Sequence, residues 1–136
     1  MKAQSLDVLI IGAGLTGIAA SIKLTEAGYD HVLIEKNEEI GGTWYENRYP
    51  GCGVDTPSHF YSYSFEINPE WTTYYPKAQE MQDYLLRVAD RYDIRSKTRF
   101  NTRVLACHWD NAAKLWQVLV QKSDGSQETH TAKAVI

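Results

Sequence analysis

The chain has 136 residues, of which 43% are hydrophobic and 23% charged, and its formal net charge is −3. This length suits one domain, and the small negative charge predicts neither nucleic acid nor an anionic membrane as a partner. The apolar runs are shorter than the ~20 residues that a membrane-spanning helix needs.

A short, branched and apolar segment, residues 6–11, predicts a buried parallel strand. It is followed by the glycine-rich stretch Gly12-Ala13-Gly14-Leu15-Thr16-Gly17. Gly12 permits a tight turn, Gly14 lets the backbone approach a pyrophosphate, and Gly17 lets the next helix pack closely on the sheet. The order of strand, glycine turn and helix is typical of a dinucleotide-binding unit.

The helix after this turn and the strand after the helix complete the pattern. Apolar residues at helical spacing begin at Leu15, and Gly28 is a plausible helix end. Residues 31–34 predict a second strand, and Glu35 follows Gly17 by 18 residues, where a carboxylate can bind a ribose hydroxyl. The helix N-terminus would attract the phosphates.

This pattern favours an adenine dinucleotide over a merely structural glycine turn, and it leaves FAD and NAD as alternatives. Glu35 would repel the 2′-phosphate of NADP, which disfavours NADP in this particular unit.

The segment from residue 37 to 76 is irregular, aromatic and rich in turn-forming residues. A loop of this length is unusual in a compact domain, so we expect it to be functional or locally folded. Within it Tyr61, Tyr63 and Phe65 alternate with serines, which predicts a short extended piece.

The second half of the chain predicts one helix and then strands. Residues 77–93 carry apolar side chains at steps of three and four, and residues 99–104 resemble a strand. Alternating segments separated by turn sequences then predict a three-stranded antiparallel meander, with strands over residues 103–108, 115–121 and 128–132.

The last residues, 134–136, look like the opening of another buried strand. We therefore expect the chain to be truncated, as the front of a larger protein. Cys52 and Cys107 lie far apart and the histidines form no ligand cluster, which predicts reduced thiols in a cytoplasmic protein and no metal site.

The long aromatic loop resembles one protein family. Residues 41–65, which begin Gly41-Gly42-Thr43-Trp44, are similar to flavin-dependent class B monooxygenases, above all the Baeyer–Villiger type and its hydroxyacetophenone monooxygenase branch. The resemblance covers essentially the whole chain, and its double glycine favours FAD over NAD.

The resemblance implies an α/β fold: a Rossmann-like, three-layer FAD-binding portion with a parallel sheet, a crossover helix, the long aromatic loop and a β-meander. Residues 1–136 would form the N-terminal part of the FAD-binding domain. The NADPH domain and the C-terminal FAD segment would lie outside this chain.

The activity that the resemblance implies uses NADPH and O₂ to insert oxygen into a small-molecule ketone or another oxygenatable substrate, with FAD carrying the chemistry. Two alternatives stay open at this point. One is an N- or S-oxygenating flavin monooxygenase, and the other is a non-catalytic, truncated flavin-binding remnant.

The resemblance also assigns roles to individual residues. Asp55 would lie beside the flavin ring and pair with a catalytic arginine, although it could instead be a loop carboxylate that bonds nearby backbone N–H groups. The residues implied to bind the cofactor are Gly12, Gly14, Thr16, Gly17, Glu35, Gly42, Thr43, Trp44, Asp55, Tyr61 and Val104.

Overall fold

The computed structural model describes residues 5–136; residues 1–4, which the predicted domain includes, lie outside the described residues. In chain order the elements are β1 (Leu6–Ile11), α1 (Leu15–Glu26), β2 (His31–Ile34), α2 (Thr43–Glu46), α3 (Ala78–Arg91), the 3₁₀ turn η1 (Arg95–Lys97), β3 (Thr98–Arg99), β4 (Thr102–Asp110), β5 (Leu115–Lys122) and β6 (Gln127–Val135). None of the helices in this described part has the length and apolar character needed to cross a membrane.

All six strands form one sheet, in the order β3-β2-β1-β6-β5-β4. β1 pairs in parallel with both β2 and β6, and β2 pairs in parallel with β3. β4, β5 and β6 pair antiparallel, as predicted for the meander. The predicted combination of a parallel sheet with a β-meander is therefore confirmed.

The end of the chain differs from the prediction. Residues 128–132 and 134–135 of the two predicted segments belong to the single strand β6, which pairs with β5 along its first part and with β1 along its last part. Ile136 directly follows this strand. Ala132 has a partner on each side, Trp116 in β5 and Leu6 in β1. Lys133 interrupts the apolar pattern because its ammonium group turns to the surface and pairs with a carboxylate of β1.

The strand predicted over residues 99–104 is also wrong, because β3 ends at Arg99 and β4 begins at Thr102. Between them Asn101 has φ +52°, a left-handed conformation that asparagine tolerates better than most residues. Its N–H donates to the carbonyl of Asn37 at 3.0 Å. This turn sends β3 and β4 to opposite edges of the sheet.

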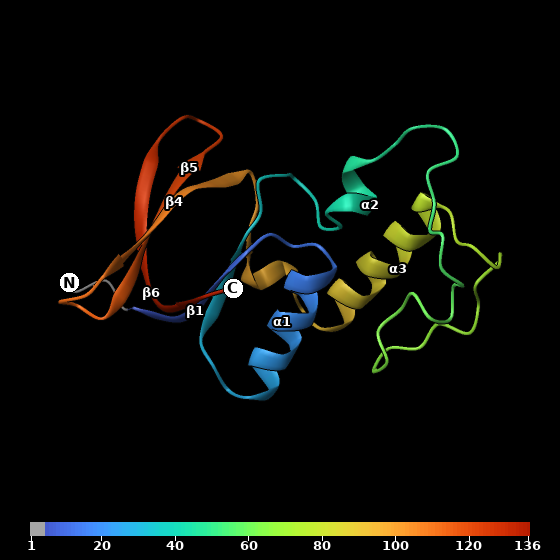
Figure 1. The fold of residues 1–136 in the computed structure, drawn as a ribbon, viewed down its shortest axis with the longest axis horizontal. Helices are drawn as coiled ribbons and strands as arrows, with labels where there is room; N and C mark the ends of the chain where they lie inside the picture. Colours follow the sequence, from blue (N-terminus) through green and yellow to red (C-terminus); the bar gives the residue numbers. More distant parts are fainter. Residues whose placement is uncertain (1–4) are drawn as a thin grey trace.

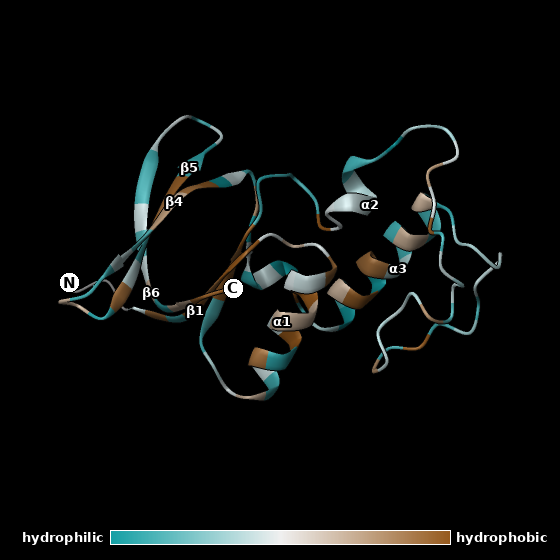
Figure 2. Ribbon diagram, in the orientation of Figure 1, coloured by the Kyte–Doolittle hydropathy of each residue, from teal (hydrophilic) through white to brown (hydrophobic). Residues whose placement is uncertain are grey.

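The meander half of this sheet curls over one face of its parallel half, and the helices cover the other face, which gives the predicted three layers. Figure 1 shows the helices on one side of β1 and the strands of the meander on the other. Alternate residues of β1 point in opposite directions: Ile10 packs into the helical core with Ile18 and Leu85, whereas Leu9 packs with Val118 and other residues of the meander. Hydrophobic colouring runs along β1 and over part of α3 (Figure 2).

The two longer helices have the ends and faces that the sequence predicts. α1 ends in a Schellman motif, in which Gly28 at φ +78° donates to the carbonyl of Thr25 and Tyr29 donates to that of Leu24. α3 buries Tyr84 and Leu85, together with Met81, Val88 and Ala89, against the sheet and the aromatic loop.

The aromatic loop is locally folded, although it contains only one short helix, α2. The piece around Tyr63 consists of turns rather than the predicted extended segment. Tyr63 stacks on Phe65 at 4.9 Å, and its hydroxyl donates to the carbonyl of Leu15 at 2.6 Å. The hydroxyl of Tyr84 in turn accepts the N–H of Tyr63. These contacts bind the loop to the start of α1 and to α3.

Candidate functional site

The first glycine turn lies at the carboxyl end of β1. Gly12 has φ +95°, which favours glycine, and its N–H donates to the carbonyl of Ile34 at 2.8 Å. A Cβ placed on Gly12 would meet no atom of the described residues within 4 Å, so the mouth of the turn is open. A Cβ on Gly17 would instead overlap the carbonyl oxygen of Gly12, which explains why only glycine lets α1 approach the turn this closely.

The N-terminus of α1 opens into the same space. Gly14 is its N-cap and supplies no capping side chain, and the first hydrogen bond of the helix runs from the N–H of Ile18 to the carbonyl of Gly14 at 3.0 Å. The amides of the first turn are therefore available to a ligand. Together with the helix dipole, they favour an anionic group such as a phosphate.

Glu35 directs its carboxylate to the first turn. The residue is only 3% exposed, and its two carboxylate oxygens accept the N–H of Ala13 at 2.7 Å and the N–H of Asn37 at 2.9 Å. Its backbone is held as well, because its N–H donates to Arg99 and its carbonyl accepts from Thr102. A carboxylate has further lone pairs, so Glu35 can still accept a hydroxyl of a ligand.

The double glycine forms the opposite wall of the turn. Gly41 and Gly42 have φ +134° and +54°, conformations that side chains disfavour, and the N–H of Gly41 donates to the carbonyl of Ala13 at 3.0 Å. A Cβ on Gly42 would lie 3.0 Å from the Cα of Gly14. The two glycine segments thus touch through their backbones.

Two cavities meet where these glycines touch. One, of about 300 Å³, contains Glu35 and Val104; the other, of about 310 Å³, contains Thr16, Trp44 and Tyr61. Their shared lining residues are Ile11, Gly12, Gly14 and Gly42. Each volume is at the lower end of the range found for ligand pockets, ~300–1,000 Å³, and together they form one elongated site, which we call the glycine groove.

Most of the predicted cofactor residues line the glycine groove. Those that do are Gly12, Gly14, Thr16, Gly17, Glu35, Gly42, Thr43, Trp44, Tyr61 and Val104. Asp55 lines neither of its two cavities and is exposed. Ten of the eleven predicted residues thus lie together in one groove, and Asp55, predicted beside them, lies outside it.

Some lining residues were not predicted from the sequence. Thr102 and Arg103 reach the groove because the N–H of Thr102, at the start of β4, donates to the carbonyl of Glu35 at 3.0 Å, a contact that no local pattern reveals. Lys36 and Glu46 line the same cavity and form an ion pair at 2.9 Å. The hydrogen bond from Lys36, together with one from the Asn37 side chain, lowers the pKa of the Glu46 carboxyl.

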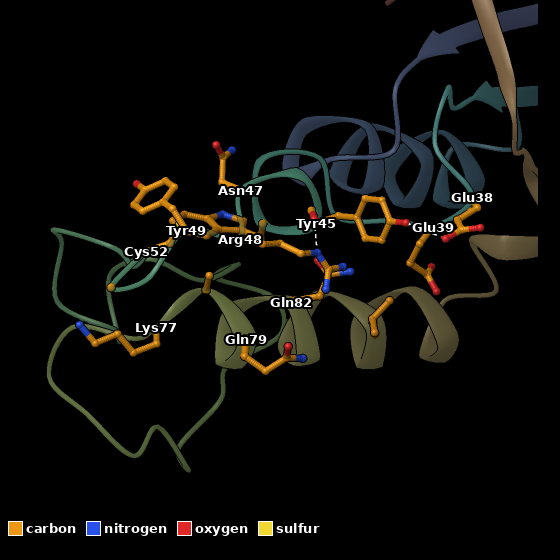
Figure 3. A pocket seen from close by; sticks show the side chains of 14 residues that line it. Glu38, Glu39, Tyr45, Asn47, Arg48, Tyr49, Cys52, Lys77, Gln79 and Gln82 are labelled. Carbon is orange, nitrogen blue, oxygen red and sulfur yellow. Dashed lines mark hydrogen bonds between the residues drawn. The ribbon is translucent and has the colours of Figure 1, made fainter.

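A larger cavity, of about 810 Å³, lies between α3 and the segment around α2. Figure 3 shows its side chains, with Arg48 above α3 and Gln82 extending from that helix. The guanidinium of Arg48 is held against Tyr45, with Nε donating to the Tyr45 carbonyl at 2.9 Å. Within residues 5–136 no three metal-ligating side chains gather at one point, in either cavity system or elsewhere.

Known proteins resemble this chain in both sequence and structure. A Baeyer–Villiger monooxygenase of Pseudomonas aeruginosa is 40% identical over 135 residues, which are 98% of this chain and 25% of that protein. The 2-oxo-Δ³-4,5,5-trimethylcyclopentenylacetyl-CoA monooxygenase of Pseudomonas putida is 41% identical over 128 residues, 90% of this chain and 23% of that enzyme. The resemblance to Baeyer–Villiger monooxygenases is thereby confirmed.

Solved structures agree. The crystal structure of OTEMO in complex with FAD and NADP has a TM-score of 0.87 and 40% identity, covering 98% of this chain and 25% of that one. Cyclohexanone monooxygenase bound to ε-caprolactone also has a TM-score of 0.87, with 38% identity, covering 98% of this chain and 26% of that one. The chain thus spans about a quarter of the length of these proteins.

The glycine turn, the buried acid and the crossover helix lie within residues 10–84, more than half of the chain, and these residues match the family described as NAD(P)-binding Rossmann-like domain. The chain belongs to the NAD(P)-binding Rossmann-like domain family.

Proposed function

We propose that this chain is the FAD-binding part of an NADPH- and O₂-dependent monooxygenase of the Baeyer–Villiger type. One observation carries the proposal: the open first turn, the buried carboxylate of Glu35 and the double glycine meet in one groove. They do so in a chain that is 40% identical to a structure solved with FAD and NADP. Because the chain spans about a quarter of that structure, the activity of the whole protein is part of the proposal.

The residues of the glycine groove fit FAD. The open mouth at Gly12 and the free amides at the start of α1 suit a pyrophosphate. Glu35 would hold the ribose next to the adenine. Beyond the double glycine, Trp44 and Tyr61 pack edge to face at 5.7 Å and supply an apolar wall for the rest of the cofactor.

When bound, FAD would supply the redox chemistry, with electrons from NADPH and oxygen from O₂. The described residues bind and orient this cofactor rather than transfer protons to a substrate. The substrate we propose is a small-molecule ketone, since one structural neighbour is a cyclohexanone monooxygenase with ε-caprolactone bound. A cytoplasmic location and the absence of nucleic acid or membrane partners stay predictions.

Asp55 keeps its proposed role as a carboxylate that pairs with a catalytic arginine outside these residues. It is exposed at the surface of the aromatic loop, where a second segment could approach it. We expect Asp55→Asn to lower kcat at least tenfold while the FAD dissociation constant and the urea midpoint stay at their wild-type values. Asp83→Asn, an exposed aspartate on α3, is the control. An unchanged kcat would remove Asp55 from the mechanism.

The function is tested on the intact protein that carries this chain. We expect the purified protein to show flavin absorbance and to oxidise NADPH faster when a cyclic ketone is added, with a lactone as product. Flavin binding with turnover of amines or sulfides alone would establish the N- or S-oxygenating alternative instead. Flavin binding without any NADPH oxidation would favour the non-catalytic remnant, and no flavin binding would refute the proposal.

A further inference from the structure

Gln82 is a buried polar residue of α3 that lies far from the double glycine in sequence and next to it in space. It is 5% exposed, and its Nε2 donates to the carbonyl of Ile40 at 2.6 Å. In Figure 3 its side chain extends from α3 towards the segment that carries α2. A single side chain thus connects the middle of α3 to the residue before the double glycine.

The amide group of Gln82 also lies directly against Gly41. A Cβ on Gly41 would overlap Oε1 of Gln82 and would lie 2.7 Å from its Cδ and 2.8 Å from its Nε2. Two facts therefore favour glycine at position 41: its φ of +134°, and the amide of Gln82 in the space that a side chain would need. Gly41 and the side-chain amide of Gln82 thus pack directly against each other.

This pair determines where the wall of the glycine groove lies. Gly41 donates its N–H to Ala13, and the next residue, Gly42, rests against the backbone of Gly14. Gly42 and Gly14 line both cavities of the groove at the point where these join. A shift of the Gln82 amide would therefore be transmitted through Gly41 to the point where the two cavities join.

The side-chain amide of Gln82 uses its donor but not its acceptor, and this indicates that the donor matters more than the packing. Its Oε1 is buried and accepts no hydrogen bond from any of residues 5–136. An unpaired buried acceptor is unfavourable, so packing alone would favour an apolar side chain of similar size at this position. What an apolar side chain cannot provide is the donor that fixes the Ile40 carbonyl.

We propose that Gln82 is a positioning residue for the cofactor, one that holds the double glycine at the distance from Gly14 that FAD binding requires. The proposal rests on the proposed function, because it assumes that FAD occupies the glycine groove. Gln82 itself lines the larger neighbouring cavity and not the groove, so it acts through Gly41 and Gly42.

The test compares Gln82→Met with Gln79→Met in the intact protein. Methionine has nearly the size of glutamine but lacks the donor. Gln79 lies three residues earlier on the same helix, lines the same larger cavity, and is exposed, with its amide bonded to Asp83 at 2.8 Å. Two quantities are measured: the FAD dissociation constant, and amide hydrogen exchange over residues 40–44 without flavin.

We expect Gln82→Met to raise the FAD dissociation constant about 3- to 10-fold, the value of one hydrogen bond, and to speed exchange over residues 40–44. Gln79→Met should change neither quantity. Faster exchange with an unchanged dissociation constant would show a purely structural role and overturn the proposal, as would no change in either. Gln82→Leu gives the same comparison should the methionine variant fold poorly.

The exchange measurement needs no flavin, so it separates this inference from the proposed function. A wild-type protein without flavin affinity would refute the function, and with it the cofactor role of Gln82. A wild-type protein that binds FAD, with Gln82→Met binding equally well, would refute the positioning role alone.

Discussion

Exchanging Glu35 for glutamine tests the geometry of the glycine groove most directly. The two carboxylate oxygens accept the N–H groups of Ala13 and Asn37, and the residue is 3% exposed. An amide of the same shape has only one oxygen, so its NH₂ group must face one of these two donors. Leaving one buried N–H unpaired costs about 1–3 kcal/mol, and this cost falls on the folded protein even without a ligand.

The measurement is urea unfolding with and without FAD. Without FAD we expect Glu35→Gln to lower the free energy of unfolding by about 1–3 kcal/mol at an unchanged m-value. FAD binding should weaken further, by about 1.5–3 kcal/mol, because a charged acceptor for the ribose is lost. The control is Glu70→Gln, an exposed glutamate. A wild-type urea midpoint for Glu35→Gln would refute the two hydrogen bonds that define the site.

Two further changes test other parts of the structure. Gly17→Ala places a methyl group on the carbonyl of the first turn, so we expect urea unfolding to show a loss of about 1–3 kcal/mol and FAD titration to show weaker binding; wild-type values would contradict the close approach of α1. The hydrogen bond from Lys133 at 2.7 Å, and a second one from a backbone N–H, lower the pKa of Asp7. The stability that Asp7 contributes is thus complete above the ordinary aspartate pKa, about 4, and is lost as the pH falls through the lowered value. Asp7→Asn should therefore reduce the loss of unfolding free energy as the pH falls below about 4. An unchanged pH dependence would exclude a stabilising Asp7–Lys133 pair.

The predictions from sequence succeeded where neighbouring residues determine the structure. The turn from Gly12 to Gly17 and the placement of Glu35 follow from glycine conformation, the apolar pattern and spacing, all of which are local. The Schellman end of α1 at Gly28 has the same origin. The family resemblance added the residues of the aromatic loop, such as Trp44, which local rules would not have assigned to a cofactor.

The predictions failed where contacts between segments far apart in sequence determine the structure. The strand predicted over residues 99–104 breaks at Asn101, whose N–H is bonded to a carbonyl far away in sequence. The sequence predicts two segments, 128–132 and 134–136, where the structure has the single strand β6, because the pairing of Lys133 with β1 involves residues far apart in sequence. Gln82 falls within the helix predicted over residues 77–93, and its contact with Gly41 depends on how α3 packs against the loop.

The double partnership of β6 has a mechanical consequence. This strand completes the meander on one side and lies beside the central strand β1 on the other. The antiparallel half therefore cannot unfold separately without breaking the backbone hydrogen bonds between β6 and β1. β1, which leads into the glycine turn, is thus stabilised by β6. We expect the parallel and antiparallel halves of the sheet to unfold together.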